Sequence, residues 1–141
     1  MNKTIAIIGA LDTKGGEFAF LKNEIEKRGC RTFVMNVGVL GEPLFEPQVS
    51  AEQVALAGGA QLSDLVSRQD RGEAMSVMTA GAAKIAAEYY QDGRFDGIIS
   101  MGGGGGTVIG TSAMRSLPVG VPKVMVSTIA SGDTSPYVGT N

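Results

Sequence analysis

The 141-residue sequence contains no histidine and a single cysteine, Cys30. Without histidine the chain has no Ser-His-Asp or Cys-His catalytic couple, no imidazole base and no histidine-bound metal. One cysteine excludes an intramolecular disulfide and a cysteine cluster for zinc or an iron–sulfur centre. Acid, base or metal-binding chemistry therefore depends on Asp, Glu, Lys, Tyr, hydroxyl groups or a bound cofactor.

Clustered positive charge and long apolar runs are also lacking. The formal net charge is −2, and no basic block provides an electrostatic surface for nucleic acid or an anionic membrane. No run approaches the roughly 20 apolar residues of a membrane span. The apolar start of the chain breaks at Asp12 without a signal-peptide cleavage site. We therefore expect no nucleic-acid partner, no membrane partner and a cytoplasmic location.

Glycine is the residue in excess. The 21 glycines are roughly twice the usual share of about 7%, and 43% apolar with 18% charged residues are enough for one packed domain. Strand-like and helix-like segments alternate, which predicts an α/β fold: a doubly wound parallel sheet of the flavodoxin or Rossmann type, with strand order 2-1-3-4. The expected strands are residues 4–8, 32–37, 97–101 and 123–127, and the expected helices are residues 17–28, 50–57, 72–91 and 107–115.

The predicted strand order brings two glycine-rich loops together. Doubly wound sheets bind ligands outside the carboxyl ends of the strands, at the point where the chain connections reverse direction. In the order 2-1-3-4 this point lies between the first and third strands. Residues 10–16 follow the first strand and residues 102–107 follow the third, so both loops are expected to border the ligand crevice.

Five consecutive glycines occupy residues 102–106. Glycine permits φ > 0 and close approach of a ligand to backbone N–H groups, and the following helix start adds partial positive charge. We interpret this loop as a cradle for phosphate or carboxylate, with a flexible linker as the alternative. No Walker pattern is present. NAD is disfavoured because no acid between Gly106 and Asp133 is available to bind a ribose.

The loop after the first strand supplies side chains that the glycines lack. Asp12 offers a carboxylate for Mg²⁺ or a ribose hydroxyl, Thr13 a hydroxyl, and Lys14 an ammonium group for a phosphate. Gly15 precedes a helix and can direct its N–H group at an anion. The alternative is that Asp12 or Thr13 caps the helix and that Lys14 is a solvated charge.

The loop after the fourth strand is rich in hydroxyl groups. Ser127, Thr128 and Ser131 lie around the pair Gly132 and Asp133, and such a segment can bind phosphate, sugar or a metal shell. These residue types are also common in ordinary turns. The predicted topology nevertheless places this loop beside the glycine loop, at the same edge of the sheet.

The long predicted helix at residues 72–91 receives a structural interpretation. Arg68 and Arg71 lie at its entry, among acidic residues, and are interpreted as solvated charges. The methionines within the helix are interpreted as core side chains rather than as a ligand surface.

The fourth strand lacks a covering helix in this sequence. Residues 135–141 are too short and too rich in turn formers to provide one, and an uncovered parallel strand is unfavourable. We therefore expect residues 1–141 to be the N-terminal portion of a longer polypeptide, or to take this cover from another chain.

Three ordered segments carry a family resemblance. Residues 5–15, 97–107 and 127–133 together resemble the N-terminal ATP-binding domain of an uncharacterised family of bacteria and plants, the tomato mosaic virus resistance protein-like family. Membership implies ATP with Mg²⁺ as the ligand, frequent self-association as a homo-oligomer, and a second, C-terminal α/β domain as partner. It implies no established reaction.

On this basis the leading hypothesis is a nucleotide-binding domain. The glycine loop and Thr107 would hold phosphates, Lys14 would neutralise them, and Asp12 or Asp133 would hold Mg²⁺. One alternative is a phosphoryl-transfer enzyme with a phosphofructokinase-like glycine loop, and another is a module that binds a small carboxylate and serves oligomer assembly. The candidate cofactor-binding residues are Asp12, Thr13, Lys14, Gly15, Gly102, Gly103, Gly104, Gly105, Gly106, Thr107, Ser127, Thr128, Ser131 and Gly132.

Overall fold

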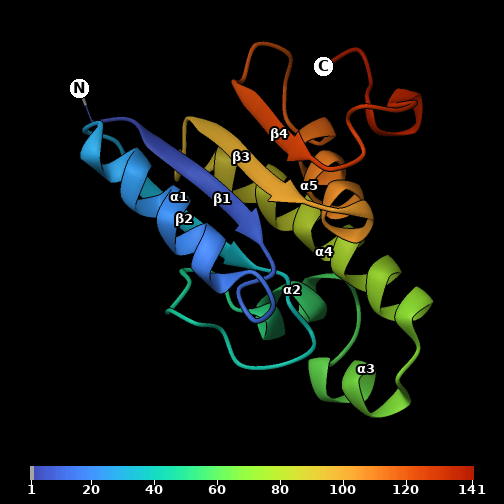
Figure 1. Ribbon diagram of the computed structural model, residues 1–141. Helices are drawn as coiled ribbons and strands as arrows, with labels where there is room; N and C mark the ends of the chain where they lie inside the picture. Colours follow the sequence, from blue (N-terminus) through green and yellow to red (C-terminus); the bar gives the residue numbers. More distant parts are fainter. Residues whose placement is uncertain (1) are drawn as a thin grey trace.

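A computed structural model describes residues 2–141 and contains one four-stranded sheet. Its strands are β1 (Thr4–Gly9), β2 (Arg31–Asn36), β3 (Gly97–Gly102) and β4 (Lys123–Ser127). All neighbours pair in parallel, in the order β2-β1-β3-β4. The predicted α/β, Rossmann-like fold and its strand order 2-1-3-4 are therefore confirmed (Figure 1).

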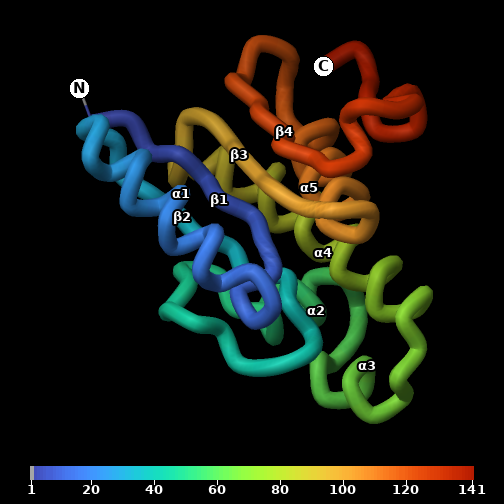
Figure 2. The backbone as a smooth tube through the Cα atoms, in the orientation of Figure 1, coloured from blue at the N-terminus to red at the C-terminus, as the bar shows by residue number. Residues whose placement is uncertain are grey.

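Helices lie on both faces of the sheet. The helix α1 (Gly15–Lys27) packs on one face, and α4 (Arg71–Gln91) and α5 (Gly104–Arg115) lie on the other (Figure 1). The short helices α2 (Ala51–Ala57) and α3 (Leu62–Arg68) lie toward the end of the sheet to which β1 points, and the tube in Figure 2 follows the chain through them into α4. A 3₁₀ turn occupies Ser135–Tyr137. No helix within residues 2–141 combines the length and the apolar character needed to cross a membrane.

The side chains of the strands divide between two cores. Successive residues of a strand point to opposite faces: Ala6 and Ile8 of β1 join the larger core under α4 and α5, whereas Ile7 joins a smaller core with Phe18 of α1. Because β1 is buried on both faces, its sequence is a continuous apolar run rather than an alternating one.

The edge strand β4 is covered on one face only. Met125 packs against the larger core, while Val124 and Val126 point to the other face and are 51% and 52% exposed. Within residues 2–141, α1 is the helix on that face, and it packs on β1 and β2. The apolar side of β4 therefore remains in contact with solvent, as the sequence predicts.

The ends of the helices follow local sequence signals in most cases. Ser50 Oγ accepts a hydrogen bond from the Gln53 backbone N–H at 3.2 Å, and Gln53 Oε1 accepts one from the Ser50 N–H at 2.8 Å. This capping box starts α2. Gly29 follows α1 with φ 83°, the left-handed conformation that glycine adopts without strain. The sequence analysis did not predict α3, a seven-residue helix that lacks a side-chain cap.

Candidate functional site

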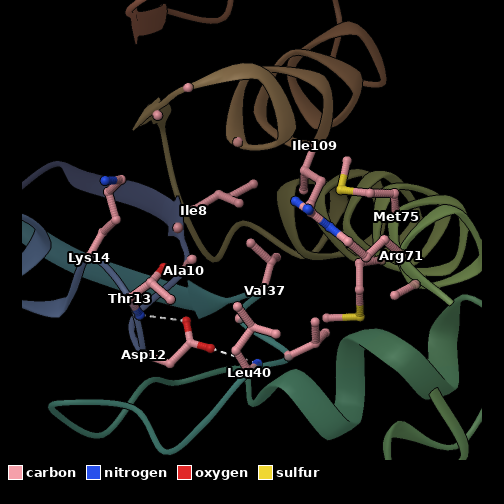
Figure 3. A pocket seen from close by; sticks show the side chains of 18 of the residues that line it. Ile8, Ala10, Asp12, Thr13, Lys14, Val37, Leu40, Arg71, Met75 and Ile109 are labelled. Carbon is pink, nitrogen blue, oxygen red and sulfur yellow. Dashed lines mark hydrogen bonds between the residues drawn. The ribbon is translucent and has the colours of Figure 1, made fainter. Parts of the chain in front are cut away.

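A cavity of about 610 Å³ lies at the predicted crevice. It lies at the carboxyl ends of β1, β2 and β3, the point where the strand order reverses, and its size falls within the usual range for ligand sites. Figure 3 shows its lining side chains, most of which are apolar. The residues named in the sequence analysis that line it are Asp12, Thr13, Lys14, Gly102, Gly103 and Gly106, together with Arg71, Met75 and Met78.

The glycine segment forms the end of a strand and the start of a helix. β3 ends at Gly102 and α5 begins at Gly104, with the Thr107 N–H donating to the Gly103 carbonyl at 2.9 Å. The predicted helix start at residue 107 was therefore wrong by one turn. The expected positive φ was also wrong, because the glycines that have it are Gly29, Gly59, Gly93 and Gly120. Helical residues have negative φ, so this segment does not use the special backbone freedom of glycine.

The structural feature of this segment is that its residues have no side chains, which allows close packing. A Cβ atom on Gly102 would lie 3.0 Å from the Cα atom of Gly106, and one on Gly105 would lie 3.4 Å from the Met75 sulfur. The first N–H groups of a helix have no intrahelical acceptor, and here no side chain of the first turn screens them. The partial positive charge at the start of α5 is therefore not screened by any side chain of the first turn.

Asp12 joins two loops that form one wall of the cavity. Its Oδ1 atom accepts a hydrogen bond from the Thr13 N–H at 2.7 Å. Its Oδ2 atom accepts from the N–H groups of Leu40 at 2.8 Å and Gly41 at 3.1 Å, in the loop after β2 (Figure 3). An ionised carboxylate has about four lone-pair positions, so one position remains for a metal ion. The role of Asp12 as a Mg²⁺ ligand stays a prediction.

Lys14 and Gly15 have different roles at the start of α1. Lys14 is the N-cap residue of α1, and α1 has no side-chain cap, so the alternative in which Asp12 or Thr13 caps this helix was wrong. The Lys14 side chain is exposed and points away from the Asp12 carboxylate (Figure 3). Gly15 is buried, and a Cβ atom there would lie 2.4 Å from the Cβ atom of Leu44, so this glycine serves packing in the structure.

Two hydroxyl groups connect the loop after β4 to the glycine segment. Thr107 is 3% exposed, and its hydroxyl donates to the Gly103 carbonyl at 2.6 Å. Since that bond uses the hydroxyl hydrogen of Thr107, Ser127 Oγ donates to Thr107 Oγ1, also at 2.6 Å. The Thr128 N–H donates to the Gly102 carbonyl at 3.1 Å. Ser127 and Thr128 therefore hold the glycine segment in place through hydrogen bonds from the loop after β4.

The rest of this loop lies outside the cavity lining. Ser131, Gly132 and Asp133 are exposed and are absent from the residues that line the cavity. The Asp133 carboxylate accepts a hydrogen bond from the Ser135 N–H at 2.9 Å. Hydrogen bonds from the Ser135 side chain and backbone lower the pKa of Asp133. The structure does not bring Asp133 together with Asp12 in a metal cluster: residues 2–141 contain no group of three or more His, Cys, Asp or Glu side chains placed to hold an ion.

Sequence reasoning missed the contribution of α4 to the cavity. Arg71, Met75 and Met78 all line it, although the sequence analysis assigned the arginine to solvent and the methionines to the core. Met78 does both, because it is 1% exposed and belongs to the larger core. Residues four apart share one helix face. Arg71 and Met75 are four residues apart, and the predicted helix began at residue 72 instead of residue 71. A helix predicted from residue 71 would have placed Arg71 on the same face as Met75.

The fold and the cavity define a class. The chain is a Rossmann-like α/β domain with a candidate ligand site at the reversal point of its sheet, bounded by a glycine-only helix start. Residues 3–141 match the family model described as "Uncharacterised protein family (UPF0261) N-terminal domain". The chain belongs to this family.

Relatives occur in bacteria and in a plant. The chain is 54% identical over 139 residues to a UPF0261 protein of Clostridium tetani, covering 99% of this chain and 34% of the relative. It is 42% identical over 138 residues to UPF0261 protein RA0729 of Rhizobium meliloti, covering 96% and 33%. The ToMV resistance protein Tm-1(GCR237) of Solanum lycopersicum is 42% identical over 71 residues, covering 50% of this chain and 9% of the relative. The chain thus spans about a third of the length of the bacterial relatives, and the resemblance drawn from three sequence segments is confirmed.

Proposed function

We propose that this domain binds ATP, with the phosphate chain at the glycine segment and the adenosine in the apolar part of the cavity. The observation that carries the proposal is the position of the α5 start: Gly103 and Gly106, on either side of its first two residues, line the cavity without any side chain. Exposed amide N–H groups and the helix dipole together form the kind of anion site that phosphate groups occupy.

The apolar lining suits the remainder of a nucleotide. Val37, Leu65, Met78 and Ile109 contribute hydrophobic side chains to the same cavity. Ligand sites commonly combine such a lining with a few polar groups that fix the orientation of the ligand. A flat nucleobase would be buried here while the phosphates face the glycine amides.

Lys14 and Mg²⁺ would complete the charge balance. The Lys14 ammonium lies on the turn that borders the cavity and would neutralise part of the phosphate charge. We propose that Mg²⁺ enters with the nucleotide, held mainly by phosphate oxygens and water, because Mg²⁺ usually keeps several waters and takes few protein ligands. Asp12, which lines the cavity, would supply a carboxylate.

A side chain placed at Gly104 tests this proposal. Gly104 lies between the cavity-lining residues Gly103 and Gly106, and a Cβ atom there meets nothing within 4 Å. Gly104→Val therefore leaves the packing of the domain intact while placing methyl groups beside the proposed phosphate site. Gly16→Val is the matched control: Gly16 is also an early residue of a helix with open space around it, and it belongs to α1 rather than to the glycine segment.

Isothermal titration with ATP, with and without Mg²⁺, measures the outcome. We expect the parent chain and Gly16→Val to bind ATP equally, and Gly104→Val to lose binding while its melting temperature stays that of Gly16→Val. If Gly104→Val binds ATP as tightly as the parent, the glycine segment is not the phosphate site.

A further inference from the structure

One face of α4 lies opposite the glycine segment, on the other side of the cavity. Arg71, Ala74, Met75 and Met78 all line the cavity, and their spacing of three and four residues places them on a single helix face. The Met75 sulfur lies 3.4 Å from the position that a Cβ atom on Gly105 would take, so this face opposes the first turn of α5. Arg71 is four residues before Met75, roughly 6 Å along the helix axis.

The guanidinium of Arg71 reaches into the cavity. Figure 3 shows it beside the side chains of Ile109 and Met75 rather than turned back along α4. Arg71 forms no ion pair with any residue between 2 and 141. The adjacent Asp70 also lines the cavity, but its Oδ1 atom accepts the Glu73 N–H at 3.1 Å and caps α4.

Arg68 provides an internal comparison, since it lies three residues earlier at the end of α3. Its guanidinium pairs with the carboxylate of Glu73, and it is absent from the residues that line the cavity. Both arginines are exposed, but they differ in placement: Arg68 pairs with a carboxylate of the domain, whereas Arg71 lines the cavity beside apolar side chains. An arginine in such a position is well suited to binding a planar or tetrahedral oxyanion through two parallel hydrogen bonds.

We propose that Arg71 binds the phosphate chain of the ligand from the side opposite Lys14, and that the cavity therefore selects nucleoside diphosphates and triphosphates over monophosphates and nucleosides. This inference rests on the proposed nucleotide binding. The positive groups come from three separate elements: Lys14 from the turn after β1, the start of α5 where Gly106 lines the cavity, and Arg71 from α4. A single phosphate can satisfy only part of such an arrangement, whereas a chain of phosphates can contact all of it.

The test compares Arg71→Ala, Arg71→Lys and the control Arg68→Ala in the 141-residue chain. Isothermal titration gives Kd values for ATP, ADP, AMP and adenosine at fixed ionic strength. For Arg71→Ala we expect ATP binding to weaken about 10- to 100-fold, the scale of a charge-assisted hydrogen bond, with adenosine unchanged within about twofold. Arg71→Lys should recover part of the loss, and Arg68→Ala should bind all four ligands like the parent.

The outcomes separate the two proposals. A parent chain that binds ATP, together with Arg71→Ala that binds ATP just as tightly, overturns the role of Arg71 and leaves nucleotide binding standing. An equal loss for ATP and adenosine also overturns it, because the residue then acts through the shape of the cavity. A parent chain that binds none of the four ligands overturns both proposals.

Discussion

The hydrogen bonds of Asp12 lead to a quantitative prediction for Asp12→Asn. The carboxylate accepts from the N–H groups of Thr13, Leu40 and Gly41. The asparagine side chain keeps one acceptor oxygen and replaces the other with an NH₂ donor. The amide can rotate so that its oxygen faces Leu40 and Gly41, and this favourable orientation keeps the two bonds to the loop after β2. The bond from the Thr13 N–H is lost, because the NH₂ group cannot accept it.

The magnitude follows from that one bond. An intramolecular hydrogen bond contributes a net free energy of about 1 kcal/mol, so its loss should lower the free energy of unfolding by about 1 kcal/mol. For a chain of this size that corresponds to a decrease in Tm of roughly 2 to 4 °C. Asp12 is only half-buried, which argues against a larger effect.

The assay combines urea unfolding with titration of ATP in EDTA and in Mg²⁺. If Asp12 acts through its hydrogen bonds to the backbone, the variant should be destabilised without any ligand, and ATP binding should weaken to a similar degree in both buffers. A variant with the unfolding free energy of the parent, whose ATP affinity falls only when Mg²⁺ is present, would refute this reasoning and identify Asp12 as a metal ligand.

Three further predictions test the charges and the exposed strand. Lys14→Ala should weaken ATP binding by roughly 1 to 3 kcal/mol and adenosine binding by less, as measured by titration; equal losses would indicate an effect on folding. The Thr4 N–H and the Lys3 ammonium hold the pKa of Asp96 below its ordinary value of 3.8, so its stabilising effect is present above that pH and is lost as the pH falls through the lower, folded-state value. Asp96→Asn should therefore flatten the acid limb of stability measured by urea unfolding between neutral pH and pH 2, and an unchanged limb would contradict the assignment. Because Val124 and Val126 are half exposed on an edge strand, replacing both with threonine should reduce self-association in sedimentation velocity, unless the parent is already monomeric at high concentration.

Local patterns in the sequence determined the order of the elements. The sequences of β1 and β3 are mainly apolar because side chains on both faces of these strands are covered. In the segments between the strands, apolar residues recur every three or four positions, which predicts helices. The capping box of Ser50 and Gln53 marked the start of α2 without any tertiary information. Right-handed crossovers then left the order 2-1-3-4 as the natural arrangement.

The glycine segment shows the limit of this reasoning. The sequence placed the glycine turn correctly between β3 and α5, but it could not distinguish a loop with positive φ from a helix that starts within the glycines. Glycine is compatible with both conformations. The packing of α5 against its neighbours, α4 above all, decides between them.

The walls of the cavity were decided by the tertiary structure alone. Asp12 meets Leu40 and Gly41 from 28 and 29 positions away, and Ser127 meets Thr107 from 20 positions away. Such pairs depend on how the loops at the carboxyl ends of the strands settle against one another, and no local propensity encodes that. Local sequence likewise could not place Arg71, which was interpreted as a solvated charge. Its position in the cavity lining depends on the packing of α4 against α5.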